Sequence, residues 1–174
     1  PANLRSCLDG FAPPLAYGGP ISALISELKF KKVEHISSAL AALADQPMVR
    51  PDFLEAATHI IPIPLATKRL QQRGFNQSAL IARQLAKRWS LKVSHCLRKE
   101  RETQPQTSMS AAERHLNVQG AFRARSRPPR HIILLDDVVT TGATMREAAI
   151  TLRQAGAESI FGLAIALTPG PHLV

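Results

Sequence analysis

Two neighbouring carboxylates and a tract of small polar residues form the part of this chain that is best equipped for chemistry. Asp136 and Asp137 come directly after four apolar residues at 132–135 and are followed by two valines. The tract that comes next consists of Thr140, Thr141, Gly142, Ala143 and Thr144. Glycine lets backbone N–H groups approach an anion closely, and threonine hydroxyls can donate to the same oxygen atoms. The spacing therefore predicts a phosphate site next to two acids that can bind hydroxyl groups or a metal ion.

The flanking residues predict the elements that position these groups. Four consecutive apolar residues are typical of a strand buried on both faces of a parallel sheet, and we expect this strand to end at the acids. Apolar residues at helical spacing from 145 to 155 predict a helix that begins in the threonine tract and ends at Gly156. Ligands of open α/β sheets bind at this edge, where the helix N-terminus adds a positive dipole. Because neighbouring side chains of an extended strand point to opposite sides, we expect one acid to face the ligand and the other to hold the loop.

A simpler interpretation of these residues stays open. An apolar strand, an acid and a helix also follow one another in α/β proteins in which the acid only caps the helix. Both acids and the complete threonine tract in register favour the phosphate site. The tract is not a Walker loop, because it lacks the lysine after a second glycine, and it is not a Gly-x-Gly-x-x-Gly fingerprint.

The rest of the chain alternates between helical and strand patterns. Helices are predicted from Pro20 to about residue 30, around residues 36–43 and after Asn76, which is placed to cap the third. Further strands are predicted at residues 59–64, 93–97 and 159–167, and loops at 65–77 and 99–117. This alternation predicts an α/β fold with a parallel sheet flanked by helices. We expect residues 1–19 to be an irregular lead-in, residues 1–58 to pack on the core with their helices, and residues 59–174 to form that core.

Composition predicts one cytoplasmic domain with an uneven charge. The chain has 174 residues, 45% of them hydrophobic, and lacks both an apolar run of membrane-spanning length and a signal-peptide profile. The net charge is +9, and residues 68–130 hold fifteen basic against three acidic residues. A field of this sign attracts a small polyphosphate or a nucleic-acid backbone, although a solvated basic surface without a partner is the alternative.

The string of four apolar residues, two aspartates, two apolar residues and Thr-Thr-Gly-x-Thr resembles the phosphoribosyl pyrophosphate (PRPP) signature of type I phosphoribosyltransferases. The resemblance implies that fold, with a small N-terminal helical segment beside it. It implies that Asp136 and Asp137 lie by the ribose hydroxyls, together with Mg²⁺, and that residues 140–144 hold the 5′-phosphate. It also places the pyrophosphate on the loop after the first strand of the core, at Thr67, Lys68 and Arg69.

The middle of the chain narrows the resemblance. The segment IIPIPLATKRLQQRGFNQS, the pattern Arg-x-Thr-x-x-Gln that begins at Arg101, and the segment ERHLNVQGAF are similar to the ComF/GntX family, as is the early segment AYGGPISALISELKFKK. That family is associated with DNA uptake by competent bacteria, so the resemblance implies single-stranded DNA and competence proteins as partners. Candidates for a lid over the ligand or for DNA contacts are Arg73, Asn76, Arg101, Thr103, Gln106, Arg114 and Asn117.

One departure from the family concerns zinc. Family members commonly carry an N-terminal cysteine cluster that ends in Cys-x-x-Cys, whereas here Cys7 stands where the last cysteine falls and Leu4 takes its partner's place. The module either lies upstream or is degenerate. Cys7 and Cys96 are far apart and lack metal-ligand spacing, so we expect no zinc and no disulfide in this chain.

Three functions stay open at this level. The first is a PRPP-binding protein of the ComF type that handles internalised single-stranded DNA. The second is an active phosphoribosyltransferase of nucleobase or nucleotide metabolism, in which cations and Mg²⁺ neutralise the departing pyrophosphate. The third is a PRPP-sensing regulator. No general base and no platform for stacking a base is identifiable in the sequence, which favours PRPP binding over turnover.

Overall fold

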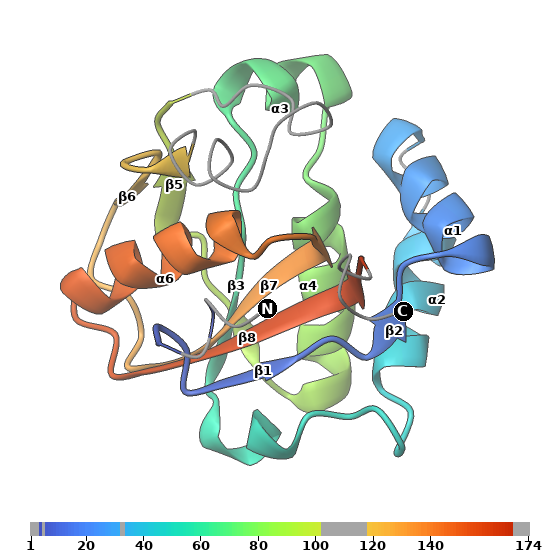
Figure 1. Cartoon of the computed structure of the whole chain (residues 1–174), viewed down its shortest axis with the longest axis horizontal. Helices are drawn as coiled ribbons and strands as arrows, with labels where there is room; N and C mark the ends of the chain where they lie inside the picture. The colour runs from blue at the N-terminus through green and yellow to red at the C-terminus, as the bar shows by residue number, and fades with distance from the viewer. Residues whose placement is uncertain (1–3, 5, 32–33, 102–117, 169–174) are drawn as a thin grey trace.

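The apolar runs predicted as strands assemble into one parallel sheet (Figure 1). The computed structural model describes residues 4, 6–31, 34–101 and 118–168. Neighbouring strands follow the order β1-β8-β7-β3-β4, and β2 also pairs with β8. The strands are β1 (Gly10–Ala12), β2 (Leu15–Ala16), β3 (His59–Pro62), β4 (Lys92–Val93), β7 (His131–Val139) and β8 (Ser159–Leu167).

Two apolar cores cover the two faces of the sheet, because alternate residues of a strand point to opposite sides. Ile132 and Leu134 of β7 belong to one core, and Ile133 and Leu135 belong to the other. All four are fully buried, as the continuous apolar run predicts for a central strand. β7 therefore lies in the middle of the molecule, and its carboxyl end is held rigidly from both sides.

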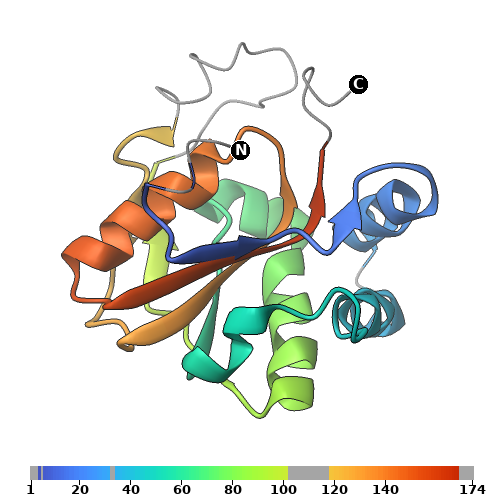
Figure 2. The ribbon, with the colours of Figure 1, turned by 60° about the horizontal axis from the view of Figure 1, so that its bottom comes forward.

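Helices supply the other half of each core (Figure 2). One helix, α6, covers the face on which Ile132 and Leu134 lie, while α1, α2 and α4 cover the opposite face. The indole N–H of Trp89 donates to Asp45 Oδ1 at 2.5 Å and ties α4 to the end of α2. The helices are α1 (Gly19–Phe30), α2 (Glu34–Ala44), the 3₁₀ helix η2 (Asp52–Ala56), α3 (Thr67–Arg73), α4 (Gln77–Trp89) and α6 (Ala143–Gln154). Among the described helices, none is long and apolar enough to cross a bilayer.

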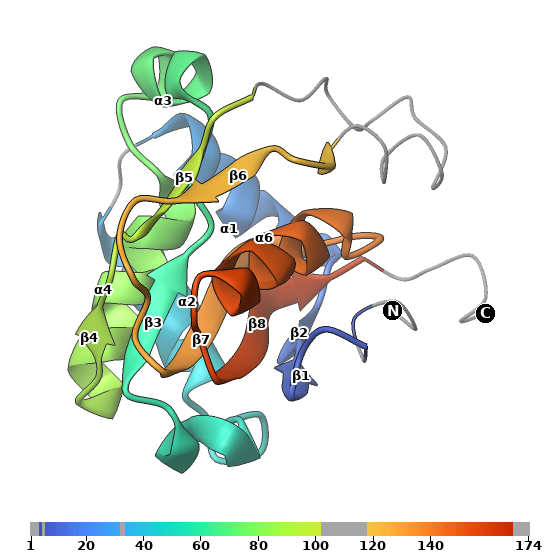
Figure 3. The same cartoon turned by 90° about the vertical axis from the view of Figure 1, so that its left-hand side faces the viewer.

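A small antiparallel ribbon lies outside the main sheet (Figure 3). It consists of β5 (Leu97–Lys99) and β6 (Phe122–Ala124), with Arg98 opposite Arg123. A single bridge between Ala66 and Lys99 joins the ribbon to the segment that follows β3. Leu97 and Phe122 bury their side chains in the core on the α6 side. The ribbon thus places Lys99 beside the carboxyl end of the sheet.

Four local predictions are wrong, and each error has a tertiary cause. The lead-in at residues 1–19 is not wholly irregular, because β1 and β2 add to the sheet along β8. The strand predicted at 93–97 divides into β4 and β5, which belong to different sheets. The predicted loop at 65–77 contains the helix α3. The central strand does not end at the acids, because β8 continues to pair with β7 as far as Val139.

Candidate functional site

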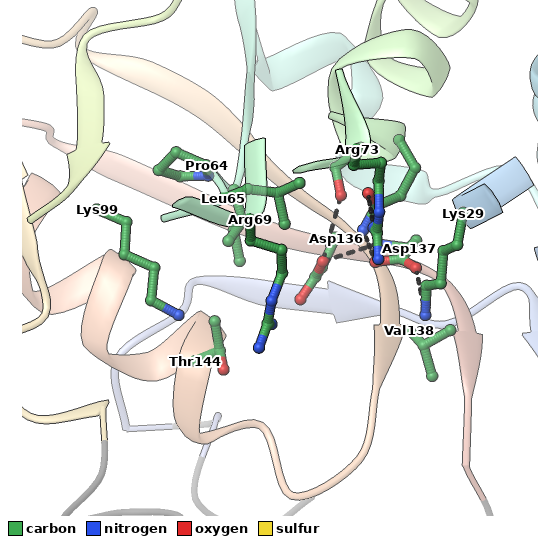
Figure 4. Close-up of a pocket in the computed structure, with 13 residues that line it drawn as sticks. Lys29, Pro64, Leu65, Arg69, Arg73, Lys99, Asp136, Asp137, Val138 and Thr144 are labelled. Carbon is green, nitrogen blue, oxygen red and sulfur yellow. Dashed lines mark hydrogen bonds and ion pairs between the residues drawn. The ribbon is translucent and has the colours of Figure 1, made fainter. Parts of the chain in front are cut away.

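A polar pocket of about 250 Å³ opens where β3 and β7 end (Figure 4). Both acids of β7 line it, as do Thr144 at the end of the threonine tract and four basic side chains from three other segments. Its lining residues are Lys29, Ile63, Pro64, Leu65, Arg69, Arg73, Gln77, Ser78, Lys99, Asp136, Asp137, Val138 and Thr144. The predicted ligand edge of the sheet is therefore the site of a real cavity.

Asp137 is the buried member of the acid pair. Its carboxylate is held by Lys29 Nζ, 2.9 Å from Oδ2, and accepts a hydrogen bond of 3.2 Å from Gln77 Nε2 at Oδ1. Burial alone would raise the pKa of Asp137, but the charge of Lys29 and the hydrogen bonds around it outweigh burial and lower the pKa. Asp137 is therefore a charged anchor that draws α1 and α4 to the end of β7.

Asp136 faces the pocket more openly. Its Oδ1 accepts hydrogen bonds from the backbone N–H of Asp137 at 2.9 Å and from Ser78 Oγ at 3.3 Å. Burial, and then the negative charge of Asp137, raise the pKa of Asp136 well above its ordinary value. The prediction that one acid faces a ligand while the other holds structure is consistent with this division. The structural partners of Asp137, however, are α1 and α4 rather than the loop.

Four cations surround the acids. Figure 4 shows Arg69 and Lys99 reaching toward Thr144 on one side of the pocket, and Lys29 next to Asp137 on the other. Arg73 donates from Nη1 to Gln77 Oε1 at 2.6 Å. Burial lowers the pKa of Arg73, although the nearby Asp137 works against this shift. With four cations against two carboxylates, the pocket has a surplus of positive charge and suits a polyanion.

The threonine tract forms a tight turn into α6. Gly142 adopts a left-handed conformation with φ 82°, and α6 begins at the next residue. A Cβ atom at Gly142 would come within 2.9 Å of Leu4 Cγ, so glycine is required both by the backbone and by the packing. The backbone N–H of Ala143 donates to Thr141 Oγ1 at 3.4 Å, and Thr144 lines the pocket. Of the predicted phosphate residues 140–144, Thr144 lines the pocket and the other four do not. The N-terminal end of a twelve-residue helix thus borders the pocket at Thr144, an arrangement that suits an anion.

The predicted pyrophosphate residues lie in α3 rather than in a loop. Arg69 lines the pocket, whereas the exposed Thr67 and Lys68 do not. These residues form the first turn of a helix instead of a loop, and their contact with a pyrophosphate stays a prediction. Arg69 is the one of the three that lies at the pocket.

The lid and DNA candidates separate into three groups. Arg73 lines the pocket, and Asn76 is a structural cap, accepting from the Ser78 N–H at 3.0 Å and donating to the Ile63 carbonyl at 2.9 Å. Arg101 is exposed and donates to the Gln119 carbonyl at 2.8 Å. The remaining candidates, Thr103, Gln106, Arg114 and Asn117, lie outside the described residues.

Sequence reasoning missed four polar residues of the pocket. Gln77 and Ser78 lie in the first turn of a helix that was predicted from its apolar pattern alone. Polar residues at the start of a helix that follows a strand are a usable signal for such a site. Lys29 and Lys99 come from segments far from the acids in sequence. Lys29 belongs to the family-like segment near the N-terminus, which was the one available signal for it.

Comparisons with known proteins agree with this geometry. The model of the phosphoribosyl transferase domain matches residues 74–170, which is more than half of the chain. A protein of Escherichia coli O6:H1 named DNA utilization protein YhgH is 37% identical over 152 residues, covering 83% of this chain and 66% of that protein. Competence protein F of Haemophilus influenzae is 36% identical over 158 residues, covering 85% of this chain and 69% of that protein. The chain thus spans about two thirds of the length of these relatives.

A solved glutamine PRPP amidotransferase from Bacillus subtilis, complexed with ADP and GMP, aligns with a TM-score of 0.46 at 18% identity, covering 76% of this chain and 25% of that one. The family is shown by the sequence matches, which include both acids, the threonine tract and all of α4. This chain belongs to the phosphoribosyl transferase domain family and, within it, to the ComF type represented by competence protein F and YhgH.

Proposed function

We propose that the chain binds PRPP, with Mg²⁺, at the end of β7 and handles single-stranded DNA as a protein of the ComF type. The observation that carries the PRPP part is the convergence of Asp136, the α6 N-terminus and a surplus of cations on one pocket. A helix N-terminus and a glycine turn suit the 5′-phosphate, and the open acid suits ribose hydroxyls.

Different residues of the site bind different groups of PRPP. The turn at residues 140–144 receives the 5′-phosphate, and Asp136 accepts hydrogen bonds from the ribose. Arg69 and Lys99 line the same pocket, where they can neutralise phosphate oxygens of the ligand. Arginine suits phosphate because its planar fork makes paired hydrogen bonds. Thr67 and Lys68 of α3 are exposed outside the pocket lining, so they would meet only pyrophosphate oxygens that extend beyond it.

Mg²⁺ fits this donor set as a companion of the ligand. Within the described part of the chain, no cluster of three or more His, Cys, Asp or Glu side chains is placed to hold a metal ion. Asp136 would therefore share the ion with oxygen atoms of PRPP, because Asp137 is already neutralised by Lys29. When bound, Mg²⁺ supplies positive charge next to the pyrophosphate.

Support for DNA handling comes from the positive charge of the chain and from its sequence similarity to named relatives. Residues 68–130 carry fifteen basic and three acidic residues, and a field of that sign attracts nucleic acid without reading its sequence. Relatives carry the names DNA utilization protein and competence protein. Both features agree with a protein that meets single-stranded DNA.

Calorimetric titration with PRPP and Mg²⁺ tests the ligand. We expect saturable binding to the wild type and a loss of about 10- to 100-fold in affinity for Asp136→Asn, the range expected for lost hydrogen bonds to a charged group. Asp52→Asn is the matched control, because it removes an exposed carboxylate of η2 outside the pocket. An undiminished affinity of Asp136→Asn, or no heat with the wild type, would overturn the proposal.

A further inference from the structure

A second cavity, larger than the first, adjoins the ligand pocket on its outer side. Its volume is about 460 Å³, and it lies between α3, the first half of α4 and the β5–β6 ribbon. Figure 3 shows these three elements on the same side of the molecule. Pro64, Leu65 and Lys99 line both cavities, so the two are direct neighbours. We call this second cavity the ribbon groove.

The ribbon groove is cationic and, unlike the ligand pocket, has no acidic residue among the described residues that line it. Its basic residues are Arg83, Arg98, Lys99 and Arg125, with His95 beside them. Arg98 pairs with Glu100. Arg83 and Arg125 are exposed, and within the described part of the chain neither has an ion-pair partner. The positive charge of these two arginines is therefore available to a partner.

Leucine side chains also line the ribbon groove. Leu70 of α3 is 41% exposed, and Leu65 is half-buried. Phe75 is also present in the lining, but only 8% of it is exposed, so it offers little ring surface for stacking. A groove that is lined by arginines without ion-pair partners and by aliphatic carbon suits a chain that is charged on one side and apolar on the other.

We propose that the ribbon groove binds the backbone of single-stranded nucleic acid. Phosphates pair with Arg83 and Arg125, and sugars or unpaired bases lie against Leu70. A duplex keeps its bases paired and stacked, so they cannot lie against Leu70. Because no exposed Phe, Tyr or Trp is among the described residues that line the groove, the sequence preference is weak. This inference rests on the proposed DNA-handling role and names its surface, and it leads the strand to the edge of the PRPP pocket.

Fluorescence anisotropy with a labelled oligothymidylate of about 20 nucleotides, longer than a typical single-strand site, tests the inference across a series of salt concentrations. Each phosphate contact to a single strand contributes about 0.7 to the slope of log affinity against log salt. The double variant Arg83→Ala/Arg125→Ala should therefore lose about 1.4 of that slope and about tenfold or more in affinity at ~0.1 M salt. Leu70→Ala should weaken binding about twofold or more with an unchanged slope, because its contact is not ionic.

Arg50→Ala/Arg127→Ala is the matched control, since it removes the same charge from two exposed arginines that do not line the groove. It should change affinity far less than the groove variant. Equal losses in both double variants, or equal affinity for a duplex of the same length, would overturn the ribbon groove while leaving DNA handling intact. Failure of the wild type to bind the oligonucleotide would overturn both the ribbon groove and the DNA-handling role. Calorimetry with PRPP would still test the ligand pocket separately.

Discussion

The acid pair and the threonine tract stand only a few residues apart, but the molecule holds them in different ways. The acids take their partners from distant elements, Lys29 in α1 and the first two residues of α4. The tract is shaped mainly by its own backbone, with Gly142 in the left-handed region and the first turn of α6 directly behind it. Leu4, packed beneath Gly142, is the long-range contact of the tract.

The two halves of the site should therefore be sensitive to different kinds of substitution. The acid pair depends on charge balance, because a buried carboxylate without a cation is costly. The tract depends on conformation, because a side chain at Gly142 is disfavoured by φ and by space. Substitutions should therefore damage the two regions through different physical routes, and the following predictions separate those routes.

The largest effect is expected where charge balance is broken. Lys29→Met should lower the free energy of unfolding by about 2–3 kcal/mol, below the full cost of a broken buried pair because Lys29 is partly exposed. Urea unfolding measures this. The pKa of Asp137 should rise, and NMR titration would detect it. Because that pKa lies below its ordinary value in the folded state, the stability contributed by the pair is present above the unfolded-state pKa and is lost as pH falls through the folded one.

Lys31→Met provides the control for Lys29→Met. Lys31 pairs with Glu27 at 3.2 Å on the exposed side of the same helix, and such surface pairs contribute about 0–1 kcal/mol. If both variants unfold at the same urea concentration, the acid pair does not depend on α1 and the contrast drawn above is wrong.

The second effect tests conformation. Gly142→Ala should cost about 2 kcal/mol, from the left-handed backbone and from contact with Leu4. Gly120→Ala is its control, since Gly120 has φ 66° but open space where a Cβ would lie, and it should cost about 1 kcal/mol. The difference between the two losses of stability, measured by thermal unfolding, isolates the cost of the contact with Leu4. Adding Leu4→Ala to the Gly142→Ala variant should remove that difference.

The third effect has the opposite sign. Asp136→Asn should stabilise the ligand-free protein at neutral pH, as measured by urea unfolding, because it removes a carboxylate whose charged form is disfavoured by burial and by Asp137. It should at the same time weaken PRPP binding. The folded-state pKa of Asp136 is raised, so its favourable protonated form is fully present below the unfolded-state pKa and is lost as pH rises through the folded one. The gain should shrink in acid. A variant less stable than the wild type at neutral pH would contradict the raised pKa of Asp136.

The smallest effect concerns the start of α4. Asn76→Ala removes the cap hydrogen bond to the Ser78 N–H and should cost about 1 kcal/mol in chemical unfolding. Asn76→Asp keeps an acceptor at the cap but loses the Nδ2 donor to the Ile63 carbonyl, so it should recover only part of the loss. Since Ser78 donates to Asp136, PRPP affinity should fall by no more than a few fold. A collapse of affinity would mean that the cap, rather than Lys29, is the main support of the acids.

Local features of the chain were predictable because they depend on neighbours in sequence. The apolar run of β7, the cap at Asn76 and the helix after Gly142 all match their predictions. The role of α3 was not predictable, because its cations resemble those of a loop and only its position beside the ribbon bridge at Ala66 reveals where Arg69 points. Lys29 and Lys99 were equally out of reach, since no periodicity links them to the acids.

The family, the sheet edge at which the candidate site lies and the identity of its acids and glycine turn are evident from the chain alone, because strand burial, glycine conformation and helix dipoles act over a few residues. Which acid is neutralised, which cations line the pocket and where a second groove adjoins it become evident only in the folded molecule. Those properties arise from side chains brought together by two cores, and electrostatic energy depends on distance in space rather than along the chain.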